Sequence, residues 1–171
     1  MGEDFKHQDT EKNEQPEDLL ADEVQRGEMT SRDIEDLRFL RDHLSQFRVN
    51  WSRATEEEIL EDFFWDNASS YVVRADVGET NELRKRIVAT GQLDLGNAED
   101  STTGVVEHIV THPDIRGKGL GRKVMEKIIE EARKKGLSRL VLTSNPTRKA
   151  AHRLYKRLGF QIVGEQQKYD K

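Results

Sequence analysis

The sequence predicts an α/β (α+β) fold, a single domain with a mixed central sheet flanked by helices. Runs of β-branched and aromatic residues alternate with amphipathic runs of helical period. In the second half of the chain the order becomes strand, glycine-rich turn, helix and strand, which is typical of layered α/β domains. The 171 residues suit one hydrophobic core, and no internal repeat divides them.

The first residues differ in composition from the rest of the chain. Residues 1–23 contain nine acidic residues against two lysines, with few apolar side chains. Such a segment buries too little apolar surface to offset the entropy lost on ordering. We therefore expect a disordered acidic tail at 1–23 and a folded domain at 24–171.

Two helices and three strands are expected in the first part of the domain. Thr30 or Ser31 caps the first helix, and Thr55 forms a capping box with Glu58 at the start of the second. The expected strands are Val24–Met29, Tyr71–Val77 and Arg86–Leu95, the last two forming a hairpin.

The second part of the domain alternates strands with helices. Apolar residues repeat every four positions from Leu120, and Gly136 ends that helix. Asn145 opens and caps the next helix, which Gly159 ends. The expected strands are Val105–Thr111, Leu140–Thr143 and a last strand at Phe160–Val163.

Composition excludes several classes of function. The net charge is −5 and no basic stripe is interleaved with aromatic residues, which argues against nucleic acid and anionic membranes as partners. The absence of cysteine excludes disulfides and thiolate chemistry. His108 and His112 lie roughly 13 Å apart on a strand, so we expect no metal site. Without a long apolar run or a signal-peptide pattern, a cytoplasmic location is expected.

One segment has a pattern that favours phosphate binding. Arg116–Gly121 (Arg-Gly-Lys-Gly-Leu-Gly) joins a predicted strand to a strongly amphipathic helix. Its glycines allow a sharp turn that points successive N–H groups and the helix N-terminus at one anion. The segment lacks the Gly-Lys-Ser/Thr ending of a nucleoside-triphosphate loop and the glycine spacing of a dinucleotide fingerprint. The remaining alternative is a glycine-rich turn without a ligand.

The residues around this turn resemble the acetyl-coenzyme A signature of the GNAT superfamily. The stretch 109–121 is similar to the family pattern of a strand end, a proline and Arg/Gln-x-x-Gly-x-Gly/Ala, with Thr111 in a position usually held by Val. The stretches 142–144 and 148–160 together resemble the second motif of the family, which ends Leu-Tyr-x-x-x-Gly-Phe. Both motifs stand in the family's order within residues 105–163, whereas earlier residues match only by element order.

The resemblance implies an N-acetyltransferase with acetyl-CoA as co-substrate. Strand backbone would pair with the pantetheine arm, and the glycine-rich turn would hold the pyrophosphate. Many members carry a coenzyme-binding asparagine where this chain has an arginine, which can instead reach a coenzyme phosphate. The cofactor-binding residues that the resemblance implies are Ile109, Val110, Thr111, Arg116, Gly117, Lys118, Gly119, Leu120, Gly121 and Arg148.

The resemblance also implies a catalytic pair. Tyr155 occupies the position of the acid that protonates the departing thiolate, and a tyrosine near its ordinary pKa keeps its proton at neutral pH. Glu107 is the candidate base for the amine. By strand alternation it shares a face with Ile109 and Thr111, whereas His108, the competing base, lies on the opposite face. Tyr155 as a packing residue and Glu107 as a solvent-facing carboxylate remain alternatives.

Together these patterns predict transfer of an acetyl group from acetyl-CoA to a primary amine by direct attack. The acceptor, on a small molecule or a protein, is not specified by the sequence. By analogy with the fold, Trp65 and Tyr71 are candidates for acceptor contacts. The alternatives are a regulatory module that binds acyl-CoA without transfer activity and a protein-interaction domain that uses the acidic tail. The exposed edge of the last strand makes a homodimer a candidate assembly.

Overall fold

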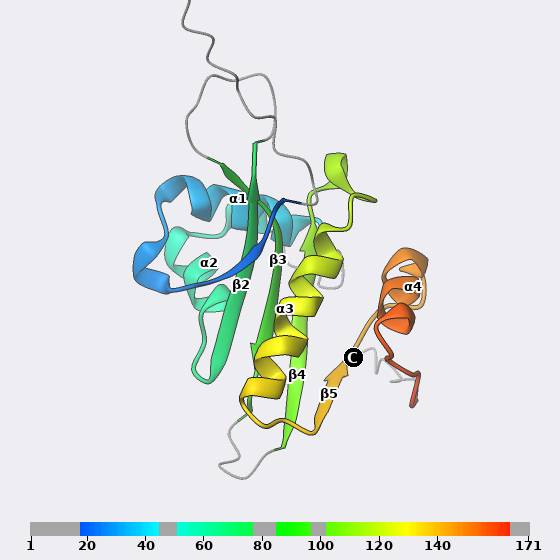
Figure 1. Cartoon of the computed structure of the whole chain (residues 1–171). Helices are drawn as coiled ribbons and strands as arrows, with labels where there is room; N and C mark the ends of the chain where they lie inside the picture. Colours follow the sequence, from blue (N-terminus) through cyan, green and yellow to red (C-terminus); the bar gives the residue numbers. More distant parts are fainter. Residues whose placement is uncertain (1–17, 45–50, 77–84, 97–101, 165–171) are drawn as a thin grey trace, which may run out of the picture.

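A computed structural model shows a five-stranded sheet with helices on both faces (Figure 1). The strands lie in the order β1-β2-β3-β4-β5. Neighbours are antiparallel from β1 to β4, and β4 pairs with β5 in parallel. The structure describes residues 18–44, 51–76, 85–96 and 102–164. The expected α/β class with a mixed sheet is confirmed.

The order of the elements follows the sequence pattern closely. The strands are β1 (Ala21–Val24), β2 (Ala68–Ala75), β3 (Arg86–Asp94), β4 (Thr103–Thr111) and β5 (Arg139–Leu142). The helices are α1 (Ser31–Asp42), α2 (Glu56–Phe63), α3 (Leu120–Lys134) and α4 (Lys149–Arg157). The capping boxes of Thr30 with Asp33 and of Thr55 with Glu58 begin α1 and α2.

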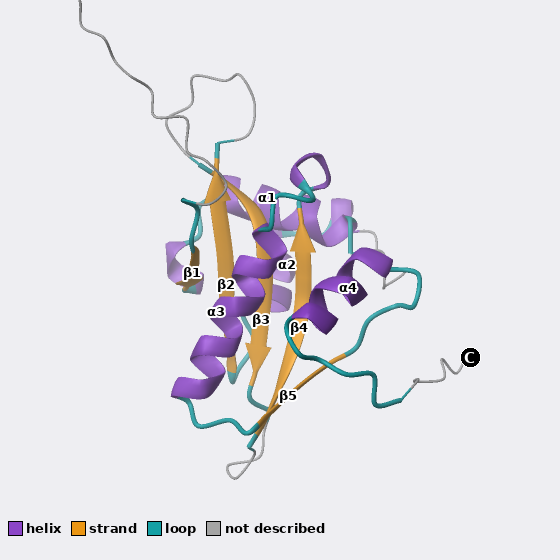
Figure 2. Ribbon diagram, turned by 45° about the vertical axis from the view of Figure 1, so that its right-hand side comes forward, coloured by secondary structure: helices purple, strands orange, loops and turns teal. Residues whose placement is uncertain are grey.

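The helices divide between the two faces of the sheet. α1 and α2 cover one face, and α3 crosses the other on its way from β4 to β5 (Figures 1 and 2). α4 lies beside the end of β5, with Leu154 and Leu158 packed on the α3 side. Among the described residues, no helix combines the length and apolar character needed to cross a membrane.

Each face of the sheet has its own hydrophobic cluster. On the α3 face, Val124 and Ile128 are fully buried against Leu93. On the other face, Leu37 of α1 and Phe63 of α2 are each only 1% exposed. Full burial of one such side chain contributes about 1.5–3 kcal/mol, so the two clusters fix both helix layers to the sheet.

β4 carries a bulge at His108. Thr90 of β3 pairs with Val110, and Gln92 pairs with Glu107, so two residues of β4 oppose one residue of β3. His108 adopts a φ of 53°, in the left-handed region that few residues other than glycine occupy. The Thr90 hydroxyl donates to the His108 carbonyl at 3.2 Å and holds this conformation. Because a bulge bends and twists its strand, β4 changes direction here.

The change of direction separates β4 from β5. Their parallel ladder extends from Thr103 and Arg139 to Val106 and Leu142, just before the bulge. Beyond that point the two strands diverge in both views (Figures 1 and 2). The second half of β4 is thereby exposed along the edge that faces α4.

The first expected strand is wrong in position. β1 is Ala21–Val24 rather than Val24–Met29, so part of the segment assigned to the tail belongs to the sheet. The chain turns at Gln25, whose N–H donates to the Glu28 carboxylate at 2.9 Å, and a short 3₁₀ helix follows. Residues 1–17 of the expected tail lie outside the described residues.

Two expectations near the C-terminus are also corrected. Phe160–Val163 forms no strand, and Ile162 and Val163 are each 83% exposed, because the segment makes no ladder with β5. Asn145 does not cap α4. Its Oδ1 instead accepts from the Thr147 N–H at 2.9 Å, which closes a turn before the helix, and Arg148 holds the N-cap position.

Gly91 allows the close approach of α3 to β3. A Cβ atom at this position would lie 2.4 Å from Ile109 Cδ1 and 2.5 Å from Val124 Cγ1. We therefore expect Gly91→Ala to lower the free energy of unfolding by about 1–3 kcal/mol, as overpacked cores do. Urea denaturation measures the change. Gly27→Ala is the control, since nothing lies within 4 Å of that Cβ, and equal stability of the two variants would contradict the packing argument.

Candidate active site

A pocket lies where β4 and β5 diverge. It is lined by Val106–Ile109 from β4, and by Leu142 and Thr143 from the end of β5. Tyr155 of α4 and Leu44, which follows α1, complete the lining. The pocket thus brings together three of the residues predicted from the sequence, Glu107, Ile109 and Tyr155. Leu44 was not anticipated, because it carries no motif, and Thr143, which stands at the start of the stretch that resembles the second family motif, was not predicted as a site residue.

Glu107 is a half-buried carboxylate in this pocket. Burial raises the pKa of Glu107 above its ordinary value, and the negative charges of Asp94 and Asp62 raise it further. Arg41 acts in the opposite direction but does not cancel these effects. A carboxylate with a raised pKa is a better proton acceptor than an exposed one, as a general base requires.

The bulge changes which side chains share a face of β4. Val106 packs in the α3-side cluster, yet Val110, four residues later, packs with α1 and α2. Regular alternation would put both on one face, so the extra residue switches the pattern. The expectation that Glu107 shares a face with Ile109 and Thr111 is therefore wrong. Glu107 lies opposite Gln92, whose side chain bonds the end of α2.

His108 also lies on the α1 and α2 side, not opposite to Glu107 as alternation predicts. Its Nδ1 forms a hydrogen bond with Gln92 Oε1, and its ring meets Trp65 edge-on with centroids 5.5 Å apart. Burial and the charge of Arg41 lower the pKa of His108 to about 3. The imidazole is therefore neutral at any pH near 7.

A buried polar network on the α1 and α2 side of the sheet contacts His108. Arg41 is 3% exposed, and its Nε lies 2.5 Å from Asp62 Oδ2. Its Nη2 donates to Gln92 Oε1 at 3.3 Å. Gln92, which is fully buried, donates to the Phe63 carbonyl at 2.5 Å and to Ser70 Oγ at 3.3 Å. This network was not predicted from the sequence. Two signals could have indicated it: Arg41 on the apolar stripe of α1, and Gln92 inside an apolar strand.

Tyr155 enters the pocket from α4, where it packs near Phe160 with ring centroids 6.1 Å apart. Burial raises the pKa of Tyr155, and the nearby positive charge of Arg148 partly opposes this. The phenol therefore keeps its proton at neutral pH. Arg148 itself donates to the carbonyl of Leu44, and so joins the start of α4 to the end of α1. Tyr71, in contrast, is fully buried under α3, so its expected contact with the acceptor is wrong.

Two glycines with positive φ shape the glycine-rich turn. Gly117 and Gly119 have φ values of 82° and 81°, while a Cβ on either would meet nothing within 4 Å, so backbone conformation rather than space requires glycine. Gly119 is the N-cap of α3 and offers no side chain to the first N–H groups. These groups remain available to an anion.

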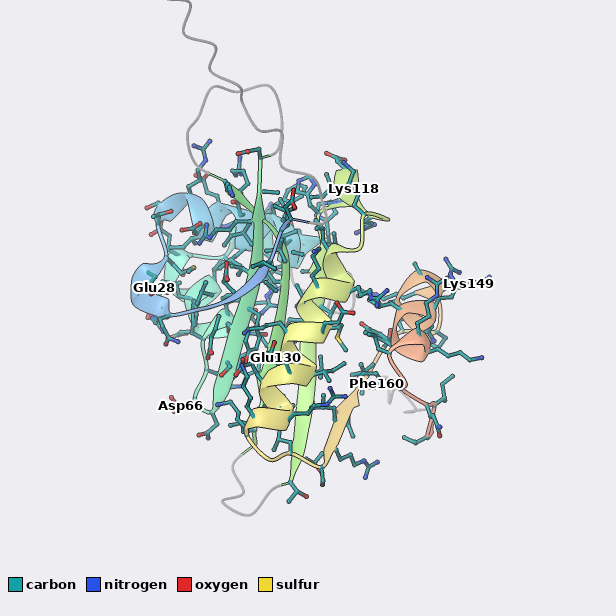
Figure 3. All side chains as sticks on the ribbon, in the orientation of Figure 1. Glu28, Asp66, Lys118, Glu130, Lys149 and Phe160 are labelled. Carbon is teal, nitrogen blue, oxygen red and sulfur yellow. The ribbon has the colours of Figure 1, made fainter. Side chains whose placement is uncertain are left out.

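The other residues predicted for the coenzyme belong to this turn or to the end of β4 that precedes it. Arg116 Nε donates to the Thr111 carbonyl at 3.3 Å, and the Cα of Gly121 faces Thr111 Oγ1. Lys118 stands at the exposed tip of the turn (Figure 3). Leu120 is buried in the core, so only its backbone faces the turn. Val110 is likewise buried, at 6% exposure, on the α1 and α2 side.

Comparisons with known proteins agree with this arrangement. Residues 37–160 match the Acetyltransferase (GNAT) family. The chain is 37% identical over 81 residues to the L-amino acid N-acyltransferase MnaT of Escherichia coli, covering 46% of this chain and 47% of that protein. It is 43% identical over 63 residues to an L-methionine sulfoximine/L-methionine sulfone acetyltransferase of Pseudomonas aeruginosa, covering 36% and 37%. The matches thus span less than half the length of these relatives.

Solved structures share the fold over most of the chain. A Trypanosoma brucei acetyltransferase superposes with a TM-score of 0.66 and 20% identity, over 90% of this chain and 100% of that one. AAC(6')-Iy, solved with the bisubstrate analogue CoA-S-monomethyl-acetylneamine, has a TM-score of 0.63 and 17% identity, over 90% and 97%. With the sheet, the glycine-rich turn and the matched motifs all in agreement, this chain belongs to the GNAT family of acetyltransferases.

Proposed function

We propose that this acetyltransferase moves an acetyl group from acetyl-CoA to a primary amine, with Glu107 as general base and Tyr155 as general acid. The observation that carries the proposal is the pocket between β4 and β5 that both residues line. Burial raises the pKa of each, which leaves a basic carboxylate on β4 and a protonated phenol on α4 in the lining of one pocket.

Acetyl-CoA would bind along β4 and the turn that follows it. The backbone of Ile109–Thr111 would accept the pantetheine arm, as a sheet edge accepts an added strand. The pyrophosphate would bind the N–H groups of residues 117–121 and the start of α3, with Arg116 and Lys118 beside it. Arg148 lies close enough to Arg116 for their charges to interact, so it is also placed to meet a coenzyme phosphate.

Glu107 takes a proton from the ammonium form of the acceptor, and the nitrogen lone pair attacks the thioester carbonyl carbon. The C–N bond forms, the C–S bond breaks, and Tyr155 gives its proton to the departing sulfur. A second proton leaves the nitrogen as the amide forms and re-protonates the phenolate. The proton on Glu107 is released to solvent. Holding both substrates in one pocket lowers the entropic cost of their meeting.

The acceptor is proposed only as a class. Relatives whose names specify L-amino acids, L-methionine sulfone or thialysine all acylate amines of small molecules. The pocket is small and open, which suits such an acceptor or an exposed protein amine. A panel of these amines with acetyl-CoA, assayed by thiol release, tests the activity. The cytoplasmic location and the homodimer expected from the sequence stay predictions, although the last strand whose edge suggested the homodimer does not form.

Replacing Tyr155 tests the proposed acid. Tyr155→Phe keeps the ring and removes only the hydroxyl, so we expect kcat to fall about 10²–10⁴-fold. Affinity for acetyl-CoA, measured by calorimetry, should stay within about twofold. Undiminished turnover at neutral pH would show that another group protonates the thiolate.

Replacing Glu107 tests the proposed base. A base must be ionised, so kcat/KM of the wild type should rise with pH through the pKa of Glu107, which lies above its ordinary 4.5. Glu107→Gln should lower kcat about 10²–10⁴-fold and abolish that rise. Two acceptors whose ammonium groups differ in pKa distinguish titration of the enzyme from titration of the substrate. Only a limb of the kcat/KM profile that lies at the same pH with both acceptors belongs to Glu107. Persistence of that limb in the variant would contradict the assignment.

A pair of glycines at opposite ends of α3 tests the anion site. Gly119→Ala and Gly136→Ala both force alanine into the left-handed region, at φ values of 81° and 74°, without a steric contact. Both should cost about 1–2 kcal/mol of stability. Only Gly119→Ala disturbs the N–H groups of the turn, so we expect it alone to raise the KM for acetyl-CoA, by about tenfold or more. Equal KM values in the two variants would refute a phosphate site there.

A further inference from the structure

His108 is the one residue of the pocket whose backbone is strained and whose side chain is fixed by buried neighbours. The bulge at φ 53° turns its imidazole away from the regular course of β4 and toward Gln92. The ring also packs edge-on against Trp65. Strain of this kind persists only where the surrounding contacts hold it, and it occurs preferentially at functional sites. Because the strained backbone brings the His108 ring to Gln92, the contacts of Gln92 indicate how the ring is held.

Hydrogen-bond partners determine which way the Gln92 amide points. Its nitrogen faces the carbonyl of Phe63 and Ser70 Oγ, whose own proton is donated to the same carbonyl at 2.6 Å. Its oxygen faces Arg41 Nη2, and arginine has only donors. The atom that meets His108 Nδ1 is therefore an acceptor. His108 must donate from Nδ1, so a neutral ring carries its lone pair on Nε2.

Burial, with a neighbouring positive charge, keeps the ring in this neutral form. Arg41 is buried beside it, held by Asp62, and its positive charge and burial together lower the pKa of His108 to about 3. Such an imidazole accepts hydrogen bonds but does not retain a proton at pH 7. Its neighbour Glu107 has the opposite character, because burial raises the pKa of that carboxyl. Two adjacent residues of one pocket thus differ in role. His108 accepts a hydrogen bond without retaining a proton, whereas Glu107 accepts a proton.

We propose that Gln92 fixes His108 as its Nδ1–H tautomer, so that Nε2 accepts a hydrogen bond from the acceptor amine and orients it beside Glu107. His108 is then a binding residue of the reaction, and Gln92 is a positioning residue that acts through it. The proposal rests on the proposed function, because it assigns roles at the same pocket. It makes the two side chains complementary: one holds an N–H of the amine while the other removes a proton from the same nitrogen.

The orientation has a defined chemical purpose. A primary amine attacks only when its lone pair points at the carbonyl carbon, and a fixed acceptor for one N–H restricts its rotation. A protonated histidine would repel the ammonium form of the acceptor, whereas the neutral ring offers it a lone pair as hydrogen-bond acceptor. The buried cation of Arg41 thus serves an indirect role, because it adds to burial in lowering the pKa of the ring proposed to meet the substrate.

The tautomer is tested on the whole protein by long-range ¹H–¹⁵N NMR of its histidines. The chain has five histidines, and His108→Asn identifies the signal, with asparagine chosen because it tolerates positive φ. We expect the Nδ1–H pattern for His108 throughout pH 5–8, and an upfield shift of Nε2 when butylamine is added to the protein saturated with CoA. An Nε2–H pattern, an imidazolium, or no shift at saturating amine overturns the proposal.

Kinetics test the consequence for the acceptor that the panel shows to turn over fastest. His108→Asn and Gln92→Met should each raise the KM of that amine by about tenfold or more, the loss expected for a hydrogen bond to a charged group. The KM for acetyl-CoA and the pH position of the Glu107 limb should be unchanged. Loss of that limb in His108→Asn would make His108 the base and refute the proposal.

Controls separate this role from a structural one and from failure of the proposed function. His43→Gln replaces an exposed histidine of the α1 end, outside the pocket lining, and should change neither KM. Gln92→Met should also move the His108 signal toward the Nε2–H pattern, while acetyl-CoA still raises its melting temperature. An unmoved signal contradicts the positioning role. If no amine is acetylated, the proposed function fails, and the NMR titration with butylamine still decides the role of His108.

Discussion

The separation of β4 from β5 is the constraint on which the site depends. The two parallel strands pair only from Thr103 to Val106 on the β4 side, and the bulge at His108 then bends β4 away. Without that extra residue the ladder would continue, and the edge proposed for the pantetheine arm would be occupied by β5. The same divergence makes room for Tyr155 to enter from α4 and for Leu44 to approach from α1. Arg148 closes the arrangement by joining α4 to the Leu44 carbonyl.

A single buried cation organises the charges beneath this opening. Burial lowers the pKa of Arg41 to about 10, and Asp62 opposes that effect, so the guanidinium stays charged at neutral pH. A buried ion pair of this kind adds little net stability, because desolvation offsets most of its attraction, but leaving either charge unpaired costs several kcal/mol. The pair is better understood through its effects on neighbours. The Arg41 cation adds to burial in keeping His108 neutral, and it limits the rise in the pKa of Glu107, which Asp62 promotes.

The sequence predicted the elements where local signals and packing agree. The helix cap at Thr30, the capping box of Thr55 with Glu58, the apolar stripe of α3 and the glycine-rich turn each have a direct physical cause, and the fold class followed from the order of the predicted strands and helices. It could not predict the bulge, because histidine in the left-handed region follows from tertiary contacts with Gln92 and Thr90 rather than from local preference. The face assignments in β4 failed for the same reason. The sequence marked Glu107 and Tyr155 as candidates, but their shared pocket depends on two strands and two helices that meet only in the folded chain.

One physical effect gives the two proposed catalytic groups their different roles. Burial disfavours the charged form of any acid, so it raises the pKa of both Glu107 and Tyr155. For a carboxyl that ordinarily titrates near 4.5, the rise makes it a stronger proton acceptor. For a phenol that ordinarily titrates near 10, the rise ensures that a proton is present to give. The pocket therefore needs no separate device to make one group a base and the other an acid, because their ordinary pKa values lie on opposite sides of neutrality.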